Sequence, residues 1–313
     1  MQYQSFNWTY FDFERFRVYL YEGGQEIARY AATSFDRQLP IMEKRLDYQI
    51  EDKIDVIVYN NQNDFKQSNI GLASEDNGNI GGVTRIIGDK IFIYFTGSHA
   101  DLDKQIRAAL AELMIDQMMY GGRTRDIVKN STLLTLPDWF KNGLIAYISE
   151  GWNSNIDNRV MDAIQNDRFT KFNQLTGKDA TMAGHAMWYY VADEFGEAVI
   201  PNLLYMTKVS RNPNNAFLYV LGLSVQNLTD EFTNKMTKLR ANIDVLDANL
   251  LELLGKRMKV AAEIGQVKKE ANVAVLQSNR WNEIQEKMVL EGGKKGLTEE
   301  FIIKLFKGIH QES

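Results

Sequence analysis

The 313-residue sequence contains no cysteine, only three histidines and only four prolines. Without cysteine the chain forms no disulfide and offers no thiolate as a nucleophile or metal ligand, although this absence says little about its compartment. His99, His185 and His310 share no ligand spacing, so each is interpreted as a surface residue or as a hydrogen-bonded core residue. We therefore expect neither a metal nor another cofactor.

The sequence also lacks a basic stripe, a long apolar run and a signal peptide. A net charge of −5 with only short clusters such as Lys268-Lys269 does not suit a general nucleic-acid binder. No segment approaches the roughly 20 apolar residues of a membrane span, and the N-terminus has no basic start followed by an apolar run. From the sequence as written we expect a cytoplasmic protein that contacts neither nucleic acid nor membrane.

The length predicts two domains, and two regions of different pattern are present. Residues 1–230 alternate β-branched and aromatic segments with helical ones, which predicts an α+β or α/β domain. Helical segments are expected at 26–32 and 38–45, with an interruption near Pro40, because proline cannot continue the hydrogen-bond ladder. The strands are expected at Phe16-Tyr21, Ile54-Tyr59, Val83-Ile87 and Lys90-Phe95, and further helices at 101–120, 136–151, 183–195 and 198–209.

From about Thr233 onward the pattern is helical only. Apolar residues recur at steps of four and three from Leu239 to Val267, which predicts one helix of about 35 residues and on the order of 50 Å. Such a helix cannot cover its apolar seam within a single module of this size, so a partner helix is expected. A second helix ending near Leu290 and a third that begins after Thr298 as N-cap complete an all-α module over residues 234–313. The boundary segment 226–235 has no Gly or Pro, which predicts a partly helical connection.

Three cationic residues of the long helix have informative spacing. Arg257 and Lys268 are 11 residues apart and return to within roughly 20° of the same face, so they can serve one pocket. Arg240 lies 17 residues before Arg257, about 25 Å along the axis, and could join that pocket only from a second chain. Since Arg and Lys on a long helix are usually solvated, spacing alone leaves that simpler interpretation open.

The run LRANIDVLDANLLELLGKRMKVAAEIGQVKKEANVAVLQSNRW, followed by GLTEEFIIKLFKGIHQES, resembles the all-helical chorismate mutase family. Members are three-helix chains that interlock as dimers, and the match covers residues 236–313. The closest resemblance is to mutase modules fused to the enzyme that opens the shikimate pathway. It implies an intertwined homodimer, chorismate as the substrate and prephenate as the product.

The resemblance also implies roles for four cationic residues. Arg240 matches the arginine that reaches into the partner's site and binds one substrate carboxylate, and Arg257 matches the arginine that binds the other. Lys268 matches the lysine that donates to the ether oxygen of the breaking C–O bond, and Arg280 matches a second-helix arginine at the site. The rearrangement is intramolecular, so such a site catalyses by holding the reactive conformer and stabilising charge on the ether oxygen.

Other matched positions depart from the common family pattern. Gln277 stands where many members have an acidic residue that contacts the substrate hydroxyl, and Trp281 stands where they have a glutamate, for which Glu283 is the candidate replacement. Ser313 matches a serine near the substrate. The sequence stops there, about one helical turn before the family's glutamine or glutamate that polarises the ether oxygen. We expect weakened catalysis, and a raised rate if one turn ending in Gln is added.

The first region resembles the peptidase-MA-like (gluzincin) group over residues 10–225. In that group a helix carries HExxH and a later helix supplies a glutamate to the same zinc ion. Here the matching segments are IRAALAELMIDQMMYGG and LPDWFKNGLIAYISEGW. The ligand positions hold Ala111, Ile115 and Asn142, and only Glu112 remains. The resemblance implies a domain without zinc or protease activity that binds a protein partner or serves structure.

Three hypotheses follow from these patterns: a chorismate mutase attached to a noncatalytic peptidase-like domain, a binding or scaffold protein dimerised by its helical module, and a divergent hydrolase. Peptidase-like domains of this kind belong mostly to exported proteins, whereas aromatic biosynthesis is cytoplasmic. That combination favours an engineered or truncated fusion. Trp139, Phe140 and Tyr147 are interpreted as core residues rather than as a substrate subsite.

Overall fold

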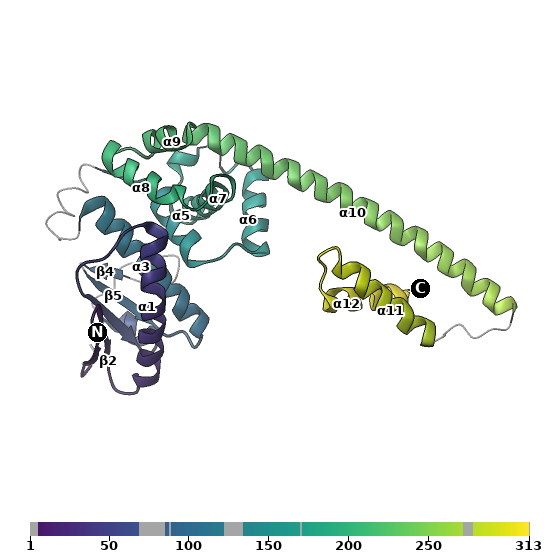
Figure 1. Ribbon diagram of the computed structural model, residues 1–313, viewed down its shortest axis with the longest axis horizontal. Coiled ribbons are helices and arrows are strands. Elements are labelled where there is room, and N and C mark those ends of the chain that lie inside the picture. The colour runs from purple at the N-terminus through teal and green to yellow at the C-terminus, as the bar shows by residue number, and fades with distance from the viewer. Residues whose placement is uncertain are drawn as a thin grey trace. The chain divides into compact units, whose positions relative to one another are not determined.

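A computed structural model describes residues 6–68, 85–87, 89–121, 134–169, 171–271 and 278–312, giving only the backbone at 85–87 and 278–283. The chain divides into two compact units, Met1–Thr237 (unit 1) and Lys238–Ser313 (unit 2). Unit 1 combines a β-sheet with helices, and unit 2 is mostly helical (Figure 1). None of the helices in the described ranges is long and apolar enough to cross a membrane.

The sheet of unit 1 has five strands in the order β1-β2-β3-β5-β4. The three central strands are parallel, and each edge strand is antiparallel to its neighbour. The strands are β1 (Thr9–Asp12), β2 (Phe16–Leu20), β3 (Ile54–Tyr59), β4 (Arg85–Ile87) and β5 (Lys90–Tyr94). The four predicted strands are confirmed within the described residues. The sequence missed β1, whose four residues are largely exposed and show no apolar alternation.

Each face of the sheet is covered by helices. Helices α1 (Gln25–Leu46) and α3 (His99–Tyr120) pack on the face that carries Val18, Val56 and Ile93, all of which are fully buried. The opposite face carries a separate aromatic cluster, Tyr21, Tyr59, Phe65 and Tyr94, to which the short helix α2 (Gln62–Gln67) contributes Phe65. Because both faces are covered, the parallel strands can be apolar on both sides.

Helix α1 runs without interruption through Pro40, so the expected break there is wrong. Pro40 lies on the exposed side of the helix, while Phe35, Leu39 and Met42 are at most 2% exposed on the other. A proline within a helix costs about 3 kcal/mol, whereas burying each of these three side chains contributes about 1.5–3 kcal/mol. Burial of the apolar face therefore outweighs the lost backbone hydrogen bond.

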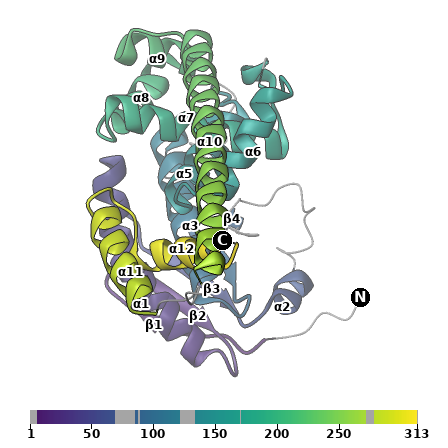
Figure 2. The same ribbon diagram turned by 90° about the vertical axis from the view of Figure 1, so that its right-hand side faces the viewer.

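The rest of unit 1 is helical and includes a very close helix contact. Both ribbon views place the strands at one end of unit 1 and α8 and α9 at the other (Figures 1 and 2). Between α5 and α7, a Cβ atom added at Gly184 would lie 1.9 Å from the carbonyl oxygen of Trp139, and one at Gly143 would lie 2.3 Å from the Cα of Gly184. The two helices therefore touch backbone to backbone. These helices are α5 (Asp138–Ser149), α6 (Ser154–Gln165), α7 (Gly177–Phe195), α8 (Val199–Ser210) and α9 (Pro213–Leu221).

The core around that contact is aromatic. Trp139, Phe140, Trp188 and Phe217 are fully buried and pack ring against ring. Each buried indole N–H has a partner: Trp188 donates to the carbonyl of Phe140 and Trp139 donates to the side chain of Asn173. The core interpretation of Trp139 and Phe140 is confirmed.

Helix α10 (Val225–Glu270) has 46 residues and is longer than the predicted 35 because it starts at Val225. Its first turns bury Val225, Leu228 and Phe232 in the core of unit 1, so the boundary segment is helical, as expected. Unit 2 adds α11 (Ser278–Gly293) and α12 (Glu299–Glu312). Thr298 accepts a hydrogen bond from the backbone N–H of Phe301, which confirms it as the N-cap of α12.

Candidate functional site

Three of the predicted site residues lie on α10. Arg257 and Lys268 are on one face of this uninterrupted helix, Arg257 exposed and Lys268 half-buried. Arg240 lies further along the same helix, where its Nε is 3.8 Å from the carboxylate of Asp244. Because the helix continues unbroken between them, Arg240 and Arg257 of one chain are separated by about 25 Å along the axis. A substrate the size of a small dicarboxylate cannot touch both within one chain.

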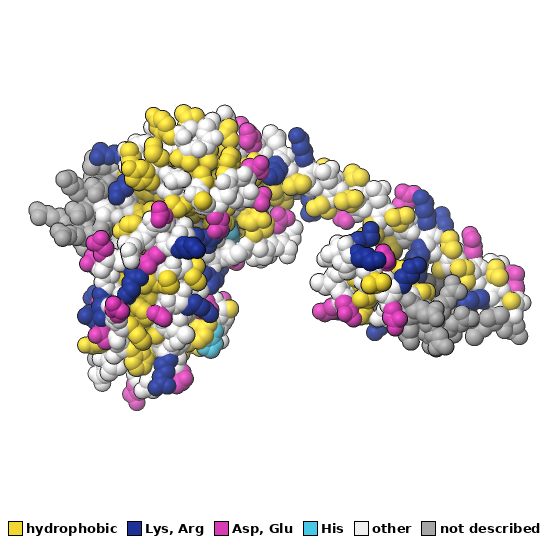
Figure 3. Space-filling model, in the orientation of Figure 1, with side chains coloured by type: hydrophobic (Ala, Val, Ile, Leu, Met, Phe, Trp, Pro, Cys, Tyr) yellow, Lys and Arg dark blue, Asp and Glu magenta, His cyan; other side chains and the backbone are white. Residues whose placement is uncertain are grey.

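The apolar seam of α10 is exposed. Ten large apolar side chains between Leu239 and Val267 are at least 47% exposed. Several of them are visible as yellow side chains along α10 in Figure 3. They are Leu239, Ile243, Val245, Leu246, Leu250, Leu251, Leu253, Val260, Ile264 and Val267. An exposed apolar stripe of this length marks an interaction surface rather than a solvated helix face.

The other expected site residues fall in or beside parts that are not described. Arg280 and Glu283 lie in the first two turns of α11, where only the backbone is described. Gln277 and Ser313 lie outside the described residues. The structure thus brings Arg257 and Lys268 to one helix face and separates Arg240 from them. It does not test the positions of the remaining four side chains.

Comparison with known proteins bears on this region. The family model for chorismate mutase type II matches residues 239–313. Unit 2 contains a chorismate mutase type II domain. A similar protein is 4-amino-4-deoxychorismate mutase of Streptomyces venezuelae, which is 28% identical over 79 residues, or 25% of this chain and 77% of that protein. The mutase domain carries Arg240, Arg257 and Lys268, so the helix with the exposed seam is also the helix with the predicted substrate-binding cations.

In unit 1 the three positions that match the zinc ligands of gluzincins hold neither histidine nor glutamate. Ala111 and Ile115 on α3 are fully buried and apolar, and Asn142 lies on α5. The remaining carboxylate, Glu112, is 3.2 Å from the ammonium of Lys141, which is also 2.7 Å from Asp116. Burial lowers the pKa of Lys141, but the two carboxylates outweigh burial and raise it. In the described part of the chain, no three His, Asp or Glu side chains are placed to hold a metal ion.

Lys141 therefore stays positively charged, and its ammonium lies between the two carboxylates. It links α5 to α3 by pairing with both Glu112 and Asp116, as structural ion pairs do. The resemblance of unit 1 to gluzincins stays a prediction.

The histidines are separated in the fold, but one differs from the expectation. His99 and His310 are exposed. His185 on α7 is only 4% exposed, and its Nε2 has no hydrogen-bond partner among the described residues, so the expectation of a hydrogen-bonded core residue is wrong for this atom. Burial lowers the pKa of His185 to about 4, with Glu150 raising and Lys104 lowering it to smaller extents. The Trp152 ring packs against the imidazole, with ring centroids 5.5 Å apart and an interplanar angle of 88°.

Sequence reasoning missed a cavity of about 470 Å³ in unit 1, beside the C-terminal end of α5. Tyr147 lines it, so the core interpretation of that residue is only half right: the ring is partly buried, and its hydroxyl donates to Glu197. Arg45 from α1 and Arg107 from α3 also line the cavity, together with Trp152 and residues of α7. No local pattern could have indicated this cavity, because its walls come from four helices far apart in the sequence.

Proposed function

We propose that unit 2 is a chorismate mutase that works as a homodimer and rearranges chorismate to prephenate. In this proposal Arg257 and Lys268 of one chain and Arg240 of its partner form each site. The observation that carries it is one helix that holds the three cations at this spacing, bears an exposed apolar seam and lies within the family match from residue 239 onward. An antiparallel partner helix would cover the seam and bring its own Arg240 to the distant pair.

The chemistry requires position and charge rather than a nucleophile. The two arginines hold the two carboxylates through forked hydrogen bonds and select the compact conformer in which the new C–C bond can form. The ammonium of Lys268 stabilises the negative charge that develops on the ether oxygen as the C–O bond breaks. No proton is transferred and no covalent intermediate forms. Loss of one such donor typically raises the barrier by about 2.7–4 kcal/mol.

Unit 1, in the same proposal, is a peptidase-like domain without hydrolytic activity. A general base needs an activated water, and Glu112 is instead paired with the ammonium of Lys141. The buried Ala111 and Ile115 leave no nitrogen ligand on α3. We infer that this unit binds a partner or a ligand.

The second candidate function is a scaffold that the helices of unit 2 dimerise without catalysis. The exposed seam favours it as much as the first candidate, because burying apolar residues does not depend on Arg257 or Lys268. The two candidates therefore agree on the dimer and differ only in turnover.

A turnover assay separates the two candidates. Purified full-length chain is incubated with chorismate, and the loss of its ultraviolet absorbance is followed beside Arg257→Ala and, as a matched control, Lys256→Ala. Lys256 is 67% exposed and paired with Glu252 on the same helix, so its loss should leave turnover unchanged. We expect Arg257→Ala to lower kcat/KM by about 10²–10³-fold. If the unmodified chain converts neither chorismate nor 4-amino-4-deoxychorismate, the mutase proposal fails and the scaffold function remains.

The second substrate is included because the similar Streptomyces protein is named for it. The two compounds differ in having a hydroxyl or an amino group at one carbon, and both keep the carboxylates that the arginines would hold. The ratio of the two kcat/KM values then names the substrate that unit 2 prefers.

A further inference from the structure

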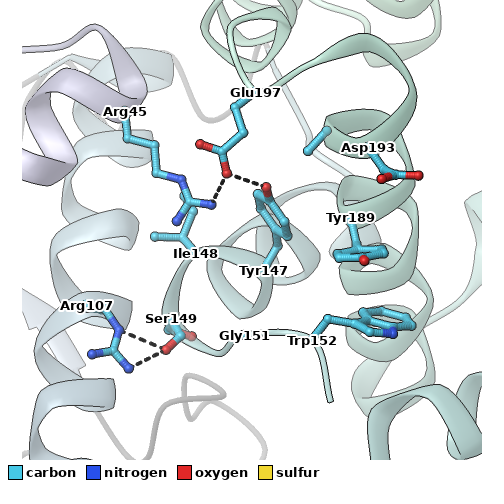
Figure 4. A pocket seen from close by; sticks show the side chains of 11 residues that line it. Arg45, Arg107, Tyr147, Ile148, Ser149, Gly151, Trp152, Tyr189, Asp193 and Glu197 are labelled. Atoms are coloured by element: carbon cyan, nitrogen blue, oxygen red, sulfur yellow. Dashed lines mark hydrogen bonds and ion pairs between the residues drawn. The ribbon is translucent and has the colours of Figure 1, made fainter. Parts of the chain in front are cut away.

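The cavity in unit 1 has one wall of charged and polar groups. Figure 4 shows Arg45 and Tyr147 both directed at the carboxylate of Glu197. The guanidinium of Arg45 is 2.7 Å from Glu197 and lies over the Tyr147 ring, 4.8 Å from its centroid. Hydrogen bonds from Tyr147 and Arg45 lower the pKa of Glu197, so Glu197 stays negatively charged. The positive charge of Arg45 in the same wall balances it. This part of the cavity carries no net charge, and Asp193, the other carboxylate of the lining, is 3.8 Å from the ammonium of Lys235.

Arg107 adds a positive charge to the cavity. Its Nε and Nη2 both donate to the backbone carbonyl of Ser149, at 3.0 and 2.8 Å, at the last turn of α5. No carboxylate among the described residues lies within ion-pair distance of it: the nearby Asp103 pairs with Arg37 and Glu150 pairs with Lys104. Burial lowers the pKa of Arg107, yet an arginine remains protonated at neutral pH. A half-buried guanidinium that faces a cavity without a carboxylate partner is a site for an anion.

The facing wall is an aromatic shelf. Trp152 and Tyr189 are stacked, with ring centroids 4.5 Å apart and an interplanar angle of 18°. Tyr189 is 38% exposed, so the outer face of the stacked pair is accessible. In Figure 4 Gly151 lies between Arg107 and this pair. A Cβ atom added at Gly151 would meet nothing within 4 Å, so the floor of the cavity is open there.

We propose that this cavity binds a small planar aromatic carboxylate, whose ring packs on the Trp152–Tyr189 shelf and whose carboxylate pairs with Arg107. A cavity of about 470 Å³ lies within the range of small-molecule sites. An aromatic ring gains from stacking on Trp and Tyr, and a carboxylate is the planar anion that a guanidinium fork matches. The same chemistry is offered by a free aromatic acid and by the aromatic C-terminal residue of a peptide.

The first experiment measures binding of three matched probes to the full-length chain by calorimetry. Indole-3-propionate carries both features, indole-3-propionamide lacks the charge, and cyclohexanepropionate lacks the aromatic ring. We expect the acid to bind and each of the other two probes to bind at least about tenfold more weakly. Equal binding of the amide, equal binding of the cyclohexane acid, or no binding of the indole acid at millimolar concentration would each overturn the proposal.

Variants then place the probe in the cavity. Tyr189→Ala removes the exposed half of the shelf, Arg107→Gln removes the charge, and Gly151→Leu adds a side chain at the floor, where a Cβ atom meets nothing within 4 Å. We expect each to weaken binding of indole-3-propionate at least about tenfold. If Arg107→Gln proves unstable because the helix end depends on it, Gly151→Leu and Tyr189→Ala still decide the question.

The matched controls lie outside the cavity. Tyr219→Ala removes a tyrosine that is 72% exposed on α9, and Arg159→Gln removes an exposed arginine on α6. Both should leave the affinity unchanged. Because unit 2 also has cations suited to carboxylates, the measurement is repeated with Arg257→Ala, which should still bind the probe. Loss of binding in that variant would place the probe in unit 2 and overturn the proposal.

A last arm distinguishes the two sources of the ligand. The peptide acetyl-Gly-Gly-Trp with a free C-terminus is compared with its C-terminal amide and with indole-3-propionate. Tighter binding of the peptide acid identifies a peptide terminus, and tighter binding of indole-3-propionate identifies a free acid. Either result supports the proposed chemistry, whereas a peptide amide that binds as well as the peptide acid would contradict the role of Arg107.

Discussion

The two units differ in where their apolar and charged side chains find contacts: within the same chain in unit 1, but not along the exposed seam of unit 2. In unit 1 the partly buried ammonium of Lys141 pairs with Glu112 and Asp116 of the same chain. The unit also buries an aromatic core around Trp139 and Trp188. Unit 2 leaves Leu246 and Leu253 more than 60% exposed on a helix that also carries widely spaced arginines. From this difference we infer that unit 1 forms its core within one chain, and we propose that the exposed seam of unit 2 is covered by a partner helix.

The largest expected effect comes from placing a charge in the seam of unit 2. Leu246→Asp would bury a carboxylate against the partner helix at a cost of several kcal/mol. We expect light scattering to report a monomer at micromolar concentration and chorismate turnover to be lost. Ala248→Asp puts the same charge about 160° away around the same helix and should preserve both. A Leu246→Asp chain that stays dimeric would show that the two units do not differ in this way.

Unit 1 is tested at its closest helix contact. Gly184→Ala places a methyl group where the Trp139 carbonyl oxygen already lies, so α5 and α7 must separate. We expect a loss of about 3 kcal/mol or more in the free energy of unfolding of unit 1. Tryptophan fluorescence in a Trp281→Phe background reports on unit 1 alone, because the other tryptophans all precede residue 238.

The control for that substitution is Gly308→Ala in α12, where an added Cβ atom meets nothing. It should leave the fluorescence transition of unit 1 unchanged. A Gly184→Ala variant as stable as the unmodified chain would mean that the backbone contact does not hold unit 1 together.

A smaller effect is expected from pH. His185 has a folded-state pKa of about 4 against an ordinary value of 6.5, so between these values the unfolded chain binds a proton that the folded chain excludes. The stability of unit 1 should therefore fall as pH is lowered from about 6.5 to about 4, by about 3 kcal/mol in total.

Denaturant unfolding at pH 7 and pH 5 measures this loss. His185→Phe should reduce the difference between the two pH values, whereas His99→Asn, at an exposed position, should not. An unchanged difference in His185→Phe would assign the pH dependence to other groups.

Much of this architecture could be predicted from local patterns. The alternation of β-branched residues located β2, β3 and β5, and the apolar steps of four and three located α10. Pro40 was misjudged because a local rule on proline takes no account of the face that Phe35 and Met42 bury. The length of α10 was underestimated because its first turns are polar on one side and are held by the core of unit 1.

The cavity and the unpaired nitrogen of His185 could not be predicted, because both depend on contacts between distant segments. Arg45, Arg107, Tyr147 and Tyr189 come from α1, α3, α5 and α7 and show no common spacing in the sequence. In unit 2 the distances between Arg240, Arg257 and Lys268 along the helix axis could be derived from the sequence, because each residue of one continuous helix adds about 1.5 Å. In the proposed function, their assembly into a site depends on a second chain.

Mixing two inactive variants tests that dependence most directly. Arg240→Ala and Arg257→Ala chains are unfolded together and refolded at equal concentration, and chorismate turnover is compared with that of the unmixed variants. Random pairing makes half of the dimers mixed, and each mixed dimer has one intact site, so the account predicts about a quarter of the unmodified activity. An Arg257→Ala and Lys268→Ala mixture, whose defects fall in the same chain's site, should recover nothing. Activity that stays at the level of the unmixed variants in the first mixture would contradict a site shared between two chains.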